Sequence, residues 1–204
     1  SLTIAVCWDF PRLAADLPII VAPLGASAVL VFAVPSSPLA QPWPVVGGNV
    51  ISTLVGVTAF QYIPNMTIAA GVGVGAAILV MSLLRCLHPP GGAAALTAVI
   101  GSSGIHEAGY SFAFAPVAIN SIALVAIAMI YHRATAHSYP HQAAHTPPVE
   151  ELSRHQRSDI DAALQDMHES FDISREDLDA LFSHADRHAL ARLTGVPTAD
   201  TRND

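Results

Sequence analysis

The stretch "LHPPGGAAALTAVIG" (residues 87–101) decides the fold, because it interrupts an apolar chain with a histidine, two prolines and two glycines. Proline is favoured in the first turn of a helix, since the N–H that it lacks would be unpaired there. The stretch therefore predicts a helix over residues 89–100. At 1.5 Å per residue this helix is only about 18 Å long, which is too short to cross a bilayer core of roughly 30 Å.

A second copy of this pattern lies earlier in the chain. The segment "PLGASAVLVFAVPSS" (residues 23–37) aligns without a gap with "PPGGAAALTAVIGSS" (residues 89–103), so that a proline, a glycine and a closing serine pair coincide. Each copy follows an apolar run and precedes another run with an early asparagine. The sequence thus predicts a unit of span, short interrupted helix and span that occurs twice.

The composition places this repeat in a membrane. Hydrophobic residues make up 52% of the chain and charged residues only 12%, and most of the charges lie beyond Arg133. Runs of about 20 apolar residues match a bilayer core. We expect spanning helices at residues 45–63, 67–84 and 112–131, and a shorter or broken one at residues 17–34. Buried helices of a large soluble protein are the alternative, but no polar sequence surrounds the runs to cover them.

Arginine positions indicate the orientation. Arg85, Arg133 and the polar tail are best placed in the cytoplasm by the positive-inside tendency. Counting spans then makes the second copy inverted relative to the first. We predict an all-α, polytopic helical membrane protein with an inverted repeat, plus a cytoplasmic helical hairpin. Short Pro/Gly-interrupted segments at corresponding positions of such a repeat indicate a transporter site near the midplane.

The two interrupted helices predict a site for a small anion. Free N–H groups and the positive end of the helix dipole attract negative charge without a charged side chain. In an inverted repeat two such ends converge, and their glycines permit close approach of the backbone. The candidate residues at these ends are Pro23, Leu24, Gly25, Ala26, Ser27, Pro89, Pro90, Gly91 and Gly92.

Four further polar residues belong to the predicted site, each with an alternative role. His88 could donate to an anion or carry a proton, or it could cap its own helix. Arg85 stands on the approach to the second short helix, but its side chain could also extend to the interface. Asn49 and Asn120 could line the path or form hydrogen bonds between helices.

The polar tail is expected to form a separate part. We divide the chain into a transmembrane domain (residues 1–133, its first helix truncated), a His/Pro-containing linker (134–157), a helical hairpin (158–195) and a disordered tail (196–204). Ser158 with Asp161, and Ser174 with Asp177, resemble N-terminal capping pairs of the two hairpin helices.

The residues described above resemble the HPP family of integral membrane proteins, which is named for the triplet that stands here as His88-Pro89-Pro90. The resemblance covers most of residues 17–133, including "APLGASAVLVFAVPSSPLAQPW" (22–43) and "VVGGNVISTLVGV" (45–57). It implies a compact multi-span protein of bacterial inner membranes or plastid envelopes that transports nitrite. Where many relatives carry a histidine after the glycine pair, this chain has Asn49.

We therefore expect a transporter or channel for a small inorganic anion, with nitrite as the first candidate, in a bacterial inner membrane with the tail in the cytoplasm. The alternative is a regulatory or scaffold membrane protein whose cytoplasmic helices recruit a partner. An enzyme is not expected, because we find no nucleophile–base pair, metal-ligand cluster or phosphate loop. The expected partners are lipid and the anion, with a homo-oligomer possible in principle, and no cofactor, metal or nucleic acid is expected.

Overall fold

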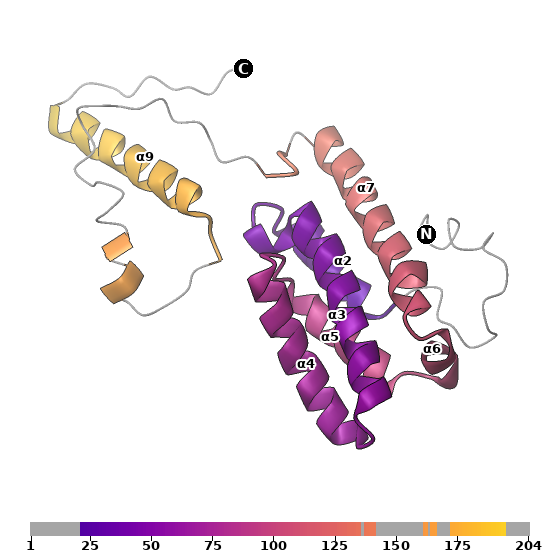
Figure 1. Cartoon of the computed structure of the whole chain (residues 1–204). Helices are drawn as coiled ribbons and strands as arrows, with labels where there is room; N and C mark the ends of the chain where they lie inside the picture. The colour runs from indigo at the N-terminus through magenta and orange to yellow at the C-terminus, as the bar shows by residue number, and fades with distance from the viewer. Residues whose placement is uncertain (1–20, 136, 142–160, 163, 167–171, 195–204) are drawn as a thin grey trace. The chain divides into compact units, whose positions relative to one another are not determined.

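The computed structural model describes residues 21–135, 137–141, 161–162, 164–166 and 172–194 (Figure 1). Within these ranges the regular structure is entirely helical and no strand occurs. The chain divides into two compact units, Ser1–His141 and Gln142–Asp204. The prediction of an all-α membrane protein is confirmed, whereas the inverted symmetry of its repeat stays a prediction.

Among the described residues of the first unit, three helices are long and apolar enough to cross a membrane. They are α3 (Pro42–Tyr62), α4 (Met66–Leu83) and a segment from Ala113 to Ala134. All three lie where the sequence predicts spans. The last one is not a continuous α-helix: the π-helical segment η2 (Ala113–Ala118) precedes α7 (Ile119–Ala134). Pro116 lies in η2, where its missing N–H interrupts the regular hydrogen bonding.

The two short helices also lie where they are predicted. Helix α2 (Pro23–Ala33) has 11 residues and α5 (Pro89–Ile100) has 12, and each begins at a proline. Helix α6 (Ser103–Ala108) follows α5 after a short connection. The part of the predicted segment 17–34 that precedes Val21 lies outside the described residues.

The four prolines of residues 35–44 predict a rigid loop between α2 and α3, but this stretch is partly helical in the structure. A short 3₁₀ helix, η1 (Pro38–Ala40), occupies its middle, and α3 already begins at Pro42. Pro42 and Pro44 fit the first turn of α3, because N–H groups at these positions have no partner within the helix. The prolines therefore start the span instead of delaying it.

Helix α3 packs closely against α4 and α5 through small residues. A Cβ on Gly56 would come within 2.3 Å of the Ala95 carbonyl oxygen, and one on Gly91 within 2.7 Å of Ser52 Oγ. The sequence predicts close packing between helices at the glycines of the spans, which are Gly47, Gly48, Gly56, Gly71, Gly73 and Gly75. The structure bears this out for Gly48, Gly56 and Gly73. It is wrong for Gly71 and Gly75, where an added Cβ would meet nothing within 4 Å.

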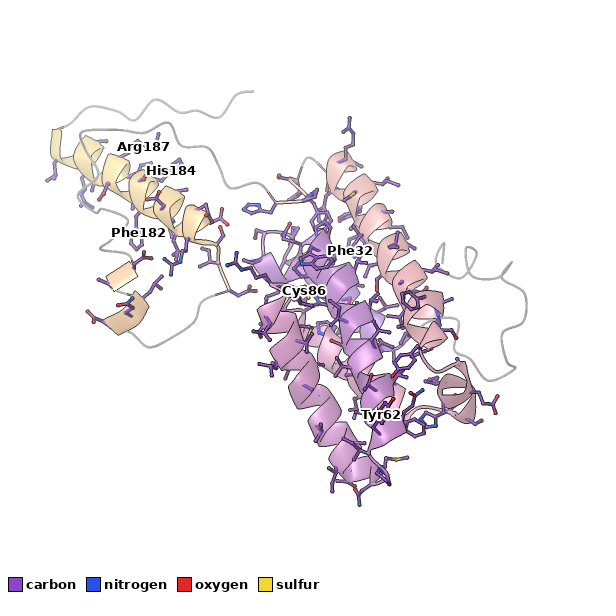
Figure 2. All side chains as sticks on the ribbon, viewed as in Figure 1. Phe32, Tyr62, Cys86, Phe182, His184 and Arg187 are labelled. Carbon is purple, nitrogen blue, oxygen red and sulfur yellow. The ribbon has the colours of Figure 1, made fainter. Side chains whose placement is uncertain are left out.

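Histidines from other elements cap the carboxyl ends of both short helices. His132 Nε2 donates to the Val31 carbonyl at the end of α2, over 2.9 Å, and His106 Nε2 to the Val99 carbonyl at the end of α5, over 3.0 Å. Pro35 has no N–H to offer Val31, so this carbonyl needs another donor. Phe32, labelled in Figure 2, lies at the same end of α2, and its ring stacks on that of His132.

The second unit is described in part. Helix α9 (Arg175–Thr194) begins with the predicted cap, because Ser174 Oγ accepts the Asp177 N–H over 3.1 Å. Asp161, from the helical residues 161–162, forms an ion pair with Arg175. Arg187 and His184 contact each other on α9 (Figure 2). The other predicted capping serine, Ser158, lies outside the described residues, as do residues 142–157 of the predicted linker and the last ten residues.

Candidate functional site

His88 is fully buried and directs its ring away from the helix that it precedes. It is the N-cap residue of α5, but its side chain makes no capping hydrogen bond there. Nδ1 lies 2.9 Å from the Leu39 carbonyl oxygen of η1, and Nε2 lies 2.8 Å from Ser27 Oγ of α2. A carbonyl can only accept, so Nδ1 carries a hydrogen and donates it. In neutral His88, Nε2 then accepts the hydroxyl hydrogen of Ser27.

Asn49 extends this hydrogen bonding to two further helices. Its Nδ2 donates to Ser27 Oγ over 3.2 Å and to Ser121 Oγ over 3.3 Å. His88, Ser27, Asn49 and Ser121 thus form one chain of hydrogen bonds between α5, α2, α3 and α7, which we call the buried cluster. Each of its four residues is at most 1% exposed. Such a network is expensive to bury in apolar surroundings unless its members satisfy one another.

A glycine makes room for this arrangement. A Cβ on Gly48 of α3 would come within 2.6 Å of His88 Cβ and within 2.9 Å of the Cys86 carbonyl oxygen. Real Cβ atoms do not approach other atoms so closely, and the backbone oxygen cannot move away easily. Gly48 therefore lets the His88 backbone lie directly against α3, next to Asn49.

One acceptor of the buried cluster is open. Asn49 Oδ1 is buried and has no hydrogen-bond partner within the described part of the chain. Leaving a buried acceptor without a partner costs about 1–3 kcal/mol. Buried polar atoms of this kind stand out in a folded protein, and at a site of converging polar side chains they indicate a position where a ligand can bind.

The predicted free N–H groups at the starts of the short helices are absent, and that interpretation is wrong in detail. Pro89 and Pro90 have no N–H, and the Gly91 N–H donates to the His88 carbonyl over 2.8 Å. At α2, Leu24 and Gly25 donate to Val21 and Ala22 over 3.0 Å each. These backbone N–H groups already donate to carbonyls of the turns at the helix starts, so they are not free to bind an anion. The side chains of the buried cluster, and not bare amides, are what the structure offers to a ligand.

The remaining predicted site residues are distributed unevenly. Asn120 is buried on α7 next to Ser121, and Pro23, Leu24 and Pro90 are buried as well. Arg85 is exposed and follows the C-cap of α4 in a left-handed conformation, with φ of +52°. Gly25, Ala26 and Pro89 are exposed, and Gly92 is half-buried. The structure therefore brings His88, Ser27 and Asn49 together and leaves the Arg85 side chain outside the buried cluster.

Sequence reasoning missed three contributors to the buried cluster. Ser121 is preceded by Asn120, and this polar pair in an apolar run was the available signal. Gly48 was assigned to helix packing only, although it also borders His88. The Leu39 carbonyl carries no sequence signal, since any residue supplies a backbone oxygen.

Comparisons with known proteins identify a family and two relatives of this chain. The sequence model of the family described as "HPP, transmembrane region" matches residues 1–140. One transmembrane protein of Dictyostelium discoideum is 34% identical over 144 residues, covering 68% of this chain and 50% of that protein. Another from the same organism is 39% identical over 120 residues, covering 56% and 38%. The chain thus spans half or less of the length of these curated relatives. No solved structure matches it.

Proposed function

The chain belongs to the HPP family of transmembrane proteins, and from this premise we propose that it is a transporter or channel for a small inorganic anion, with nitrite as the first candidate. The family membership establishes an integral membrane protein in a lipid bilayer. The activity, the anion and the assignment to transport instead of catalysis are our proposals, as is a bacterial inner membrane with the tail in the cytoplasm.

The observation that carries the proposal is the buried cluster itself. It lies where the two short helices contact each other through the bond between Ser27 and His88, 2.8 Å long. A protein that needs helices only as an anchor gains nothing from broken helices and a buried imidazole, since polar groups at membrane depth are costly. Short helices joined to a polar site are typical of transporters, whose ligands bind between such segments.

The chemistry of the site differs from a bare helix terminus. The dipoles of α2 and α5 still favour negative charge near their amino ends. Direct contact, however, depends on the amide of Asn49 and on the hydroxyls and imidazole around it. These groups suit a ligand of a few atoms that both donors and acceptors can hold.

A regulatory or scaffold role is the second candidate, and α9 is the observation that favours it. Large apolar side chains are exposed on this helix, with Leu181 at 58% and Leu193 at 67%. Exposed apolar residues of a helix can bind a partner protein. This role leaves the buried cluster without a purpose, so transport accounts for more of the structure.

Flux measurements test the proposal. The purified protein is reconstituted in liposomes, and entry of nitrite, nitrate, formate and chloride is followed with and without a pH gradient. We expect nitrite entry above that of empty vesicles. Equal rates in empty and protein-containing vesicles for all four anions would leave the scaffold role as the better explanation.

A further inference from the structure

The hydrogen bonds of the buried cluster run in one order from donor to acceptor, and the protonation of His88 determines this order. Nδ1 always donates to the Leu39 carbonyl, so Nε2 is the atom of the ring that gains or loses a proton. While Nε2 is bare, it accepts from Ser27, and Ser27 Oγ in turn accepts from Asn49 Nδ2. This order fixes the Asn49 amide with Nδ2 toward the serines and Oδ1 away from them, where the described residues supply no donor. We call the point that Oδ1 faces the open position. While His88 is neutral, the group that faces a ligand is therefore Asn49 Oδ1, a hydrogen-bond acceptor.

A proton on His88 Nε2 reverses this order. Nε2 then donates to Ser27 Oγ, and the serine hydrogen must turn to another acceptor. Asn49 Oδ1 becomes that acceptor if the side-chain amide rotates by about 180°. The Pro23 carbonyl oxygen is a weaker alternative, because it lies 3.4 Å from Ser27 Oγ. Ser121 fits either orientation, because a hydroxyl both donates and accepts. The turned amide points Nδ2, a donor, at the open position.

The charge balance of the site also favours binding of an anion together with a proton on His88. An anion buried without a counter-charge is strongly disfavoured. Among the described residues of the first unit the arginines are Arg85 and Arg133, and both are exposed. The His88 ring hydrogen-bonds to Ser27 of α2 and to the Leu39 carbonyl of η1, and Gly48 of α3 lies against its Cβ. None of these groups titrates.

The titratable residues nearest to His88 along the chain are Cys86, which is buried, and Arg85. His132 of α7 is bound to Val31 at the far end of α2. A proton on His88 is therefore the positive charge that the buried cluster itself can supply.

We propose that the site binds its anion together with one proton, which His88 accepts. When the proton arrives, Ser27 and the Asn49 amide reorient, so that the amide offers a hydrogen-bond donor to the anion. This inference rests on the proposed transport function and makes it electroneutral. A bare-anion channel would instead be driven by the membrane potential.

Nitrite influx into proteoliposomes tests the coupling, with the rate in empty vesicles subtracted because nitrous acid crosses lipid unaided. One arm imposes an acidic outside at zero potential, and the other imposes a potential of either sign at equal pH. We expect the protein-dependent rate to rise up to about tenfold per unit of outside acidification, the limit for one titrating group. We expect no response to the potential.

Variants of Ser27 locate the coupling. Ser27→Ala removes the hydroxyl between His88 and Asn49, so the flux that remains should lose its dependence on outside pH. Ser27→Thr keeps a hydroxyl and should keep the dependence. Ser52→Ala is the matched control: Ser52 is also buried, on α3, but its hydroxyl donates to Met81 Sδ over 3.2 Å, outside the buried cluster.

The outcomes separate this inference from the proposed function. Influx that follows the potential and ignores pH overturns the coupling but leaves transport intact. A pH dependence that Ser27→Ala leaves unchanged also overturns it. If Ser27→Ala carries no flux, the wild-type response to pH and potential decides. An absence of flux for nitrite, nitrate, formate and chloride contradicts the proposed function itself.

Discussion

At the scale of single residues, Gly48 is the position on which the site most visibly depends. A side chain there would overlap His88 Cβ at 2.6 Å. We expect Gly48→Ala to destabilise the protein by about 1–3 kcal/mol, as overpacking does, and to abolish nitrite flux because His88 is displaced. Thermal unfolding in detergent and liposome flux check the two effects.

Gly71→Ala is the control for this substitution. Gly71 lies on α4, and an added Cβ would meet nothing within 4 Å. Since alanine is the better helix former by roughly 0.5–1 kcal/mol, this variant should be as stable as the wild type or slightly more so. A Gly48→Ala protein with unchanged flux would show that His88 need not lie against α3.

Tyr139 lies outside the spans, and burial shifts the pKa of its hydroxyl. Its hydroxyl donates to the Ala40 carbonyl over 2.9 Å, and burial raises its pKa to about 12. The ordinary pKa of tyrosine is about 10, so folding favours the protonated phenol. The stability that Tyr139 contributes should be complete below pH of about 10, and it should be lost as the pH rises toward about 12.

The variant Tyr139→Phe checks this prediction. It should cost about 0.5–1.5 kcal/mol at neutral pH, the usual value of one hydrogen bond. It should also remove part of the alkaline loss of stability, measured as thermal unfolding against pH. An identical alkaline decline in the variant would assign that decline to other groups.

At the scale of the elements, the ends of the short helices depend on distant histidines. His132 Nε2 donates to the Val31 carbonyl, which Pro35 cannot serve. We expect His132→Phe, which keeps a ring but removes the donor, to cost about 1–3 kcal/mol in thermal unfolding. The exposed His137 provides the control His137→Ala, because its side-chain hydrogen bonds among the described residues go to Thr135 and its backbone bond to the His132 carbonyl survives the substitution. Its ring lies 6.0 Å from that of His132, so the control also measures the loss of this ring contact. Equal stability of His132→Phe and the control would contradict the role of this cap.

The sequence predicts where several helices begin, but not how some of them are connected or interrupted. Pro23 and Pro89 mark the beginnings of α2 and α5 because proline fits the first helical turn. The same rule applies to Pro42, but the prolines around it were interpreted as a loop. The break in η2 was missed as well, since an apolar run with one proline does not show whether the helix bends or changes its pitch.

The members of the site were also predicted more readily than their contacts. Ser27, Asn49 and His88 each stand out as polar residues in apolar segments. Ser27 and His88 are 61 residues apart, and Ser27 and Asn49 are 22 apart, so only the packing of α2, α3 and α5 shows that they bond. The backbone turns that consume the N–H groups of Leu24 and Gly91 were equally hidden, because they depend on local geometry and not on residue type.

At the scale of the first unit, the charged residues that the structure describes, Arg85, Arg133 and Glu107, lie at two opposite ends. Trp43 Nε1 donates to the Leu84 carbonyl, which places Arg85 beside the start of α3. Tyr139 bonds to Ala40, near the same start, and follows the end of α7 that carries Arg133. His106 stacks on Phe60, near the other end of α3, and thereby places Glu107 there.

The positive-inside tendency then predicts that Arg85 faces the cytoplasm and Glu107 the opposite side. Single cysteines at these two exposed positions, in a protein with Cys7 and Cys86 replaced by alanine, can be labelled with a maleimide that does not cross membranes. In intact cells Glu107→Cys should react and Arg85→Cys should not, and inside-out vesicles should give the reverse. Reaction of both variants from one side would contradict the crossing of the membrane by α3 and by the chain between Arg85 and Glu107, of which the short α5 is one part. A clean reversal would place the tail outside.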